Sequence, residues 1–376
     1  MTRSETGQLL LTGVPGYELD ADTAALYRKI QPGGFILFGR NIKTPAQLRK
    51  LVDDLRALSI IEPIITIDQE GGRVSRLRLI GSEPPNAQQL RQRDSLELIA
   101  RHGAITAGLL RLFGFNLDLC PVLDISFDDE ADNSLRGRCY GSSVQQTIRN
   151  AGTFNTGLRD GGIASCGKHF PGYSRAPLDA HHELPVIPLS RAELDSHELA
   201  VFREFIPAGK NPATVPGSVD SMMVCHAQYP ALEPEGLPAS LSHRIVTGLL
   251  REELGFAGLV MTDDLDMGAI LNHYSLEDTI RLAITAGNDL AMICHQIEAL
   301  PQAHTFLDRL PAATLDRALQ SVVRFKQRLA PPLPFSDEQF RLRDADVHQL
   351  RLDTLGPELA AQLSPEDGKR SPVELY

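Results

Sequence analysis

Gly258-Leu-Val-Met-Thr-Asp-Asp264 is the stretch of sequence that decides the fold. Its apolar part is long enough for one buried strand, and two carboxylates follow that strand directly. Similar apolar runs recur along the chain and alternate with longer segments of helical period, which is typical of a parallel α/β protein. The eight predicted strands are Gln8–Thr12, Gly34–Phe38, Pro63–Ile67, Phe115–Leu119, Ile163–Gly167, Ser221–Cys225, Gly258–Thr262 and Asp289–Ile293.

The segments between these strands predict helices that begin near a cap residue or a proline, and several end at a glycine. No GxGxxG motif follows a predicted strand, which disfavours an open doubly wound sheet. Eight strand–helix units that close on themselves predict a (β/α)8 TIM-type barrel. The predicted helices are Ala21–Lys29, Pro45–Leu58, Leu96–Leu112, Val144–Asp160, Arg191–Phe205, Ser242–Leu254 and Leu276–Ala286.

We expect one domain rather than several, because α/β barrels of about 250 residues and more fold as single units. Residues 1–330 are predicted to form the barrel. Residues 331–376 begin with a proline-rich turn and are predicted to form a C-terminal tail, partly helical, with a mobile end.

Composition narrows the class of protein. The chain of 376 residues has 37 basic and 48 acidic residues, a net charge of −11, and no basic stripe, so we expect no nucleic-acid partner. Its five cysteines show no CxxC pair, which indicates a reducing compartment. No apolar run reaches the length of about 18 residues that a membrane helix needs. These features predict a cytoplasmic protein that does not bind membranes, a monomer or weak homodimer.

Ionisable residues follow six of the eight predicted strands, and they mark the candidate site. A single polar residue at a strand end is usually a helix cap, but the carboxyl ends of barrel strands meet at one mouth, where active sites lie. Two loops rich in polar, Gly and Pro residues, 126–142 and 171–189, would extend the same rim. The strand-end residues are Asp68, Asp124, Lys168 with His169, His226, Asp263 with Asp264, and His295.

Around these strand ends the sequence resembles glycoside hydrolase family 3, and within it the bacterial β-N-acetylglucosaminidases of cell-wall recycling. The resemblance extends in the family's order over residues from about 20 to 300, nearly the whole predicted barrel. Its segments are Ile67-Asp-Gln-Glu-Gly-Gly-Arg-Val-Ser-Arg76, Asn116–Asp124, Lys168-His-Phe-Pro-Gly172, Asp179-Ala-His181 with Leu184-Pro185, Pro238-Ala-Ser-Leu-Ser242 and Leu250–Met267.

The resemblance implies a retaining, exo-acting glycosidase that releases N-acetylglucosamine, with no metal and no organic cofactor. Retaining hydrolysis needs a carboxylate below the anomeric carbon and a proton donor at the leaving oxygen. Asp263 matches the family's nucleophile, which forms a covalent glycosyl-enzyme. His181 matches the acid/base, a role that suits a group titrating near neutrality, and Asp179 would orient it.

By the same resemblance, five further residues would bind the terminal sugar as a small carbohydrate substrate. Carboxylates accept hydrogen bonds from hydroxyls, whereas lysine, histidine and the forked guanidinium donate them. These candidates are Asp68, Arg76, Arg138, Lys168 and His169. Glu70 is expected to brace the Gly71-Gly72 turn and is left out of the site.

One loop departs from the family pattern. After Gly172, relatives continue with His-Gly-Asp-Thr, whereas this chain has Tyr173-Ser-Arg-Ala176. The two-residue spacing of Asp179 and His181 is kept, but their mounting is altered. The conformation of the loop and the aglycone preference therefore stay open.

Several alternative functions also stay open. A β-glucosidase or β-xylosidase of the family generally takes its acid/base from a second domain, which we do not expect here. An N-acetylglucosamine phosphorylase is compatible with an imidazole acid/base, which does not repel phosphate. A catalytically silent sugar-binding barrel would follow if His181 could not reach Asp263. A metal-dependent amidohydrolase and a serine hydrolase are disfavoured, because strand one has no HxH and no GxSxG occurs.

Overall fold

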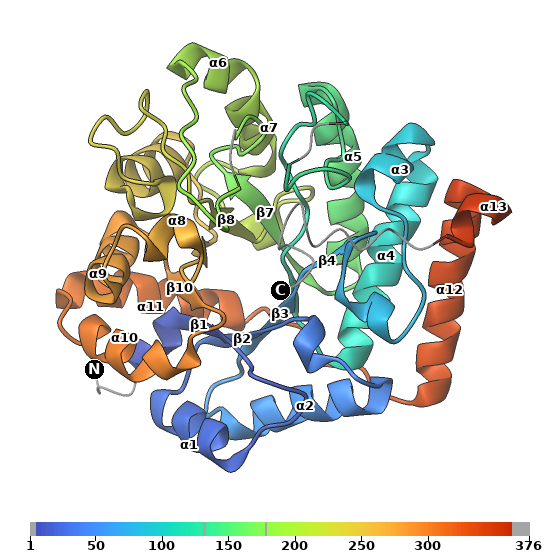
Figure 1. Cartoon of the computed structure of the whole chain (residues 1–376), viewed down its shortest axis with the longest axis horizontal. Helices are drawn as coiled ribbons and strands as arrows, with labels where there is room; N and C mark the ends of the chain where they lie inside the picture. Colours follow the sequence, from blue (N-terminus) through green and yellow to red (C-terminus); the bar gives the residue numbers. More distant parts are fainter. Residues whose placement is uncertain (1–4, 131–132, 177–178, 363–376) are drawn as a thin grey trace.

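The structure of the chain, a computed structural model, describes residues 5–130, 133–176 and 179–362. In these residues eight parallel strands pair in sequence order and close into a barrel, with helices around it (Figure 1). The predicted (β/α)8 barrel is therefore confirmed. Its strands are β1 Leu10–Gly13, β2 Gly34–Leu37, β3 Ile64–Ile67, β6 Leu117–Asp118, β7 Ala164–Phe170, β8 Ser221–Val224, β9 Leu259–Asp264 and β10 Leu290–Ile293.

Two strands extend further toward the mouth of the barrel than predicted. β7 continues through Lys168 and His169 to pair Phe170 with Val224 of β8, and β9 includes Asp263. The prediction that these polar residues follow the strands is thus wrong in detail, because polar side chains can stay in a strand when their backbones keep pairing. Their placement on strands gives them a more rigid mounting than loops would.

Five predicted helices are confirmed to within one residue at either end. Side chains of Ser, Thr or Asp cap each N-terminus, and glycines with positive φ follow two of the helices, at Gly114 and Gly287. These helices are α1 Ala21–Ile30, α2 Pro45–Leu58, α4 Leu96–Phe113, α5 Val144–Asp160 and α9 Leu276–Ala286.

The predicted helix Arg191–Phe205 is wrong as one element. It is divided into α6 Arg191–Ser196 and α7 Glu198–Phe205 by His197, whose φ of −126° and ψ of −84° are not helical. Competing local bonds accompany the break, since the Ser196 hydroxyl donates to the Glu193 carbonyl at 3.0 Å. The predicted helix Ser242–Leu254 is shorter, Arg244–Glu253, and is wound as a π-helix.

Other elements were not predicted. A small antiparallel hairpin, β4 Gln69–Gly71 and β5 Val74–Ser75, follows β3 directly. The short helix α8 Gly268–Leu271 follows β9. Three further helices were not predicted, α3 Ala87–Gln92, α10 Leu300–Leu307 and α11 Ala312–Lys326.

The C-terminal region contains one long helix, α12 Asp337–Leu355, followed by α13 Pro357–Ala360. α12 lies beside α4 on the outside of the barrel (Figure 1). Arg101 and Asp353 form an ion pair between them at 2.8 Å, and the rings of Phe113 and Phe340 pack with centroids 5.5 Å apart. The predicted mobile end falls mostly on residues 363–376, outside the described residues. The boundary at residue 330 stays a prediction.

The core consists of the strands and the inner faces of the surrounding helices. All residues of β1, β2, β3, β8 and β10 are buried, as expected for parallel strands covered on both sides. Within the described ranges no helix is long and apolar enough to cross a membrane.

Candidate active site

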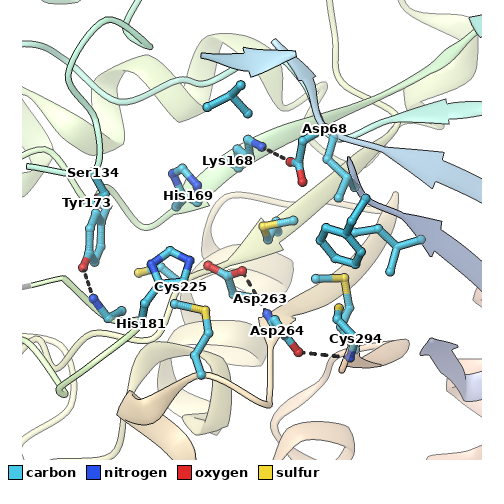
Figure 2. Close-up of a pocket in the computed structure, with 18 of the residues that line it drawn as sticks. Asp68, Ser134, Lys168, His169, Tyr173, His181, Cys225, Asp263, Asp264 and Cys294 are labelled. Atoms are coloured by element: carbon cyan, nitrogen blue, oxygen red, sulfur yellow. Dashed lines mark hydrogen bonds and ion pairs between the residues drawn. The ribbon is translucent and has the colours of Figure 1, made fainter. Parts of the chain in front are cut away.

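A pocket opens at the carboxyl ends of the barrel strands, and all eight residues predicted for the site line it. Figure 2 labels Asp68, Lys168, His169, His181 and Asp263 among them. The space inside the pocket, open mouth included, is about 760 Å³. The eight come from β3 and β5 ends, from β7, from β9 and from both rim loops. They are Asp68, Arg76, Arg138, Lys168, His169, Asp179, His181 and Asp263.

The neighbouring carboxylates Asp263 and Asp264 differ in their surroundings. The Asp264 backbone N–H donates to Asp263 Oδ1 at 2.9 Å, and the Asp263 carboxylate points into the pocket (Figure 2). The Asp264 side chain instead ties β9 to β10: its Oδ1 accepts from the Cys294 N–H at 3.2 Å, and its Oδ2 lies 3.3 Å from His295 Nε2. Both carboxylates line the pocket, and Asp263 is the one less engaged with other parts of the protein.

Neither Asp264 nor Asp266 caps the helix that follows β9. α8 has Met267 at its N-cap and no side-chain cap. Asp266 Oδ2 accepts from the backbone N–H groups of His295 and Gln296 at 2.7 and 2.9 Å. Burial, reinforced by the charge of Asp264, raises the pKa of the Asp266 carboxyl.

The Asp179–His181 pair has the geometry of an oriented imidazole. His181 Nδ1 and Asp179 Oδ1 are 2.6 Å apart, and the same oxygen accepts from the His181 backbone N–H at 3.0 Å. The His181 ring lines the pocket beside Asp263 (Figure 2). His182 is not among the residues that line the pocket.

The loop that carries this pair is attached to the segment that follows β9. The Gly268 N–H donates to the His181 carbonyl at 3.0 Å, and the Ala269 N–H donates to the Ala180 carbonyl at 3.1 Å. A Cβ on Gly268 would lie only 2.8 Å from the His181 carbonyl oxygen and 2.5 Å from that of His182. Only glycine permits this close approach without a shift of the loop.

A buried cluster of charges lies at one side of the pocket. Lys168 Nζ lies 2.6 Å from Asp68 Oδ1 and 2.7 Å from Glu70 Oε1. Arg138 binds Glu70 through two parallel bonds of 2.8 and 2.7 Å, and Arg76 Nη2 lies 3.8 Å from Asp68 Oδ2. Three cations thus face two carboxylates in a water-poor environment.

The pKa values of this cluster follow from its charges. Burial opposes ionisation of Asp68, but Lys168 and Arg76 outweigh it and hold the pKa of its carboxyl below the usual range. Burial also opposes ionisation of Glu70, and Arg138 and Lys168 hold its pKa low. Burial would lower the pKa of Lys168, yet the two carboxylates raise it above the ordinary value. Every member is therefore charged near neutral pH.

Glu70 does not line the pocket, in agreement with its omission from the predicted site, but it does more than brace a glycine turn. Its buried carboxylate holds Arg138 and Lys168 at once. Nothing in the local sequence pairs Glu70 with residues this far along the chain, so the role could not be predicted.

Two strand-end residues expected at the mouth lie behind it. Asp124 is buried, with Oδ2 2.7 Å from His169 Nδ1 and Oδ1 accepting from the Tyr173 N–H at 2.6 Å, so it orients His169. His226 is buried between the Ser240 hydroxyl and the Asp264 carbonyl, at 2.7 and 2.9 Å, and burial lowers its pKa. His295 does line the pocket.

No sequence pattern marks the apolar part of the pocket wall, because its residues have the pattern of ordinary core residues. They are Ile36, Phe38, Val74, Leu119, Met223, Met267 and Met292. Among the residues that the structure describes, no three His, Cys, Asp or Glu side chains are arranged to hold a metal ion. Proton transfer and carboxylate chemistry are what this set of side chains offers.

Comparison with known proteins gives a consistent result. The model of the glycosyl hydrolase family 3 N-terminal domain matches residues 1–325. The chain is 36% identical over 307 residues to a β-hexosaminidase of Vibrio cholerae serotype O1 (strain M66-2), covering 81% of this chain and 87% of that protein. It is 31% identical over 312 residues to a β-hexosaminidase of Pseudomonas aeruginosa (strain LESB58), covering 82% of this chain and 90% of the relative.

Similar solved structures include members of the same family. A glycoside hydrolase family 3 β-N-acetylglucosaminidase from Paenibacillus sp. str. FPU-7 superposes with a TM-score of 0.82 at 33% identity, over 94% of this chain and 69% of that one. Native NagZ from Neisseria gonorrhoeae superposes with a TM-score of 0.76 at 25% identity, over 91% of this chain and 97% of that one.

Proposed function

The chain belongs to glycosyl hydrolase family 3 and is a glycoside hydrolase, and from that premise we propose that it is a retaining exo-β-N-acetylglucosaminidase. Its substrates would be cell-wall- or chitin-derived fragments with a terminal β-linked N-acetylglucosamine. One observation carries the proposal: a single pocket holds the Asp263 carboxylate, the oriented His181 imidazole and the charged cluster around Asp68. The β-hexosaminidase names of the similar proteins support the choice of sugar.

In the first step His181 acts as the acid. With Nδ1 bound to Asp179, Nε2 is the atom that delivers a proton to the glycosidic oxygen while an Asp263 oxygen attacks the anomeric carbon. The carbon–oxygen bond to the leaving group breaks, and an ester between Asp263 and the sugar forms. Asp179 stabilises the protonated imidazole and fixes its orientation.

In the second step the same imidazole acts as the base. A water molecule gives its proton to His181 Nε2 and attacks the anomeric carbon from the side the leaving group left. The bond to Asp263 breaks and its carboxylate is regenerated. Two inversions give net retention of the β configuration.

The charged cluster would position the terminal sugar. Lys168 and Arg76 hold the two oxygens of Asp68 in a fixed direction, so that this carboxylate can accept bonds from two vicinal hydroxyls. Arg138 and His169 are fixed in turn by Glu70 and Asp124. Such preorganisation reduces the entropy lost when the substrate is placed for reaction.

The same proposal includes the predicted cytoplasmic location. All five cysteines are free and buried, which suits a reducing compartment. The monomer or weak homodimer also stays a prediction.

The test is release of p-nitrophenol from the N-acetyl-β-glucosaminide and the β-glucoside by the wild type and by Asp263→Ala. We expect turnover of the first substrate, loss of that activity in the variant, and free N-acetylglucosamine as product even when phosphate is present. Preference for the glucoside would refute the choice of sugar. A sugar 1-phosphate product would show a phosphorylase, and no turnover of either substrate would favour a purely binding barrel.

A further inference from the structure

The departure from the family pattern at residues 173–176 forms a well-anchored segment. The Ser174 hydroxyl accepts from the Ile125 N–H at 2.8 Å. The Arg175 guanidinium lies over the Phe127 ring, 4.2 Å from its centroid, and 3.9 Å from the buried carboxylate of Glu198. Three contacts to different parts of the rim thus fix the segment just before the loop that carries His181.

Tyr173 connects this anchored segment to the catalytic pair. Its hydroxyl accepts from the backbone N–H of Ala180 at 2.9 Å, and Ala180 is the residue between Asp179 and His181 (Figure 2). The Tyr173 N–H is itself held by Asp124 at 2.6 Å. The tyrosine is buried in the pocket wall, and burial raises the pKa of its hydroxyl, so it is neutral in the working pH range.

We propose that Tyr173 is a positioning residue that holds the Asp179–His181 pair over the nucleophile through the Ala180 backbone. Tyr173 stands where relatives have a histidine, and its hydroxyl binds the Ala180 backbone N–H. The inference rests on the proposed function, because it assigns no chemistry of its own to Tyr173.

The hydrogen bond between Tyr173 and Ala180 is separate from the attachment of the loop to α8. Gly268 and Ala269 donate to the carbonyls of His181 and Ala180, whereas Tyr173 accepts from the Ala180 N–H. Ala180 is buried, so its N–H without an acceptor would favour loop positions in which it reaches water. Each such displacement moves Nε2 of His181 away from the glycosidic oxygen.

A misplaced acid affects poor leaving groups most, because they need the proton at the transition state. The Tyr173→Phe variant keeps the ring in the pocket wall and removes only the hydroxyl group. We expect it to lower kcat/KM by on the order of tenfold for aryl glycosaminides with poor leaving groups, about 1.4 kcal/mol at the transition state. For the most acidic phenols the loss should stay within about twofold.

The matched control is Tyr140→Phe. Tyr140 is also buried, but its hydroxyl has no hydrogen-bond partner and it does not line the pocket. Removing that hydroxyl should leave both kcat/KM and its dependence on leaving-group acidity unchanged. His181→Ala is the positive control, since it should show the steepest dependence.

The experiment compares the slope of log kcat/KM against phenol pKa for the wild type and the three variants. Steeper slopes in Tyr173→Phe and His181→Ala, with a wild-type slope in Tyr140→Phe, support the inference. An active wild type, a steep His181→Ala slope and an unchanged Tyr173→Phe slope would overturn the inference alone. A wild type without activity would overturn the proposed function as well.

Discussion

Replacing Glu70 by Gln should destabilise the protein strongly although the residue never touches the pocket. Its carboxylate compensates two buried cations through three contacts of 2.7–2.8 Å, two to Arg138 and one to Lys168. Breaking a buried ion pair by removing one partner costs about 3–5 kcal/mol, because the other charge stays buried. Since glutamine keeps one acceptor oxygen, we expect the lower end, about 3 kcal/mol of unfolding free energy.

The assay is urea-induced unfolding followed by circular dichroism, with Glu62→Gln as the control. Glu62 also pairs with an arginine, Arg56, at 2.7 Å, but its side chain is 48% exposed. The control should therefore lose less than about 1 kcal/mol. A loss below about 1 kcal/mol for Glu70→Gln would refute the reasoning that this carboxylate neutralises the buried cluster. We also expect Glu70→Gln to raise the KM for the glycosaminide, because Arg138 and Lys168 lose their fixed orientation.

Two further predictions concern single positions, Gly268 and Lys326. In Gly268→Ala the new methyl group would lie 2.8 Å from the His181 carbonyl oxygen, so we expect kcat to fall by roughly a hundredfold, as for a reacting group misplaced by about 1 Å. The control is Gly248→Ala, whose Cβ would meet nothing closer than 3.9 Å and which should keep wild-type activity. Equal rates in both variants would contradict the packing argument. Burial lowers the pKa of Lys326 to about 7, against about 10.4 in an unfolded chain. Below the folded pKa the protein therefore bears the full cost of a buried charge, and that cost is relieved as pH rises from about 7 to 10. The stability advantage of Lys326→Met over the wild type should shrink across this window in thermal unfolding; a constant difference would show that the lysine stays charged.

Much of the fold could be predicted because short apolar runs and capped helical segments alternate regularly along the chain. Thr44, Ser143 and Ser275 cap the predicted helices, and their side chains bond to backbone N–H groups as that role requires. The break at His197 could not be predicted, since competing local hydrogen bonds decide it against an otherwise helical pattern.

The candidate site could be predicted where chemistry lies at strand ends, as for Asp68 and Asp263. It could not be predicted where a residue acts through a partner far along the chain. Glu70 meets Arg138 from 68 positions away, and Asp124 meets His169 from 45. The apolar wall was missed for a different reason, because residues such as Met292 have the same pattern whether they fill the core or face a sugar.

The most direct test of the proposed mechanism is to trap the covalent intermediate. A fluorinated N-acetylglucosaminyl fluoride would slow both steps, while its good leaving group lets the first proceed, so that the glycosyl-enzyme accumulates. Peptide mapping by mass spectrometry after an acid quench should then place the sugar on Asp263, with Asp264 unmodified. A sugar found on another residue, or no adduct in an enzyme that is demonstrably inactivated, would contradict the assignment of Asp263 as the nucleophile.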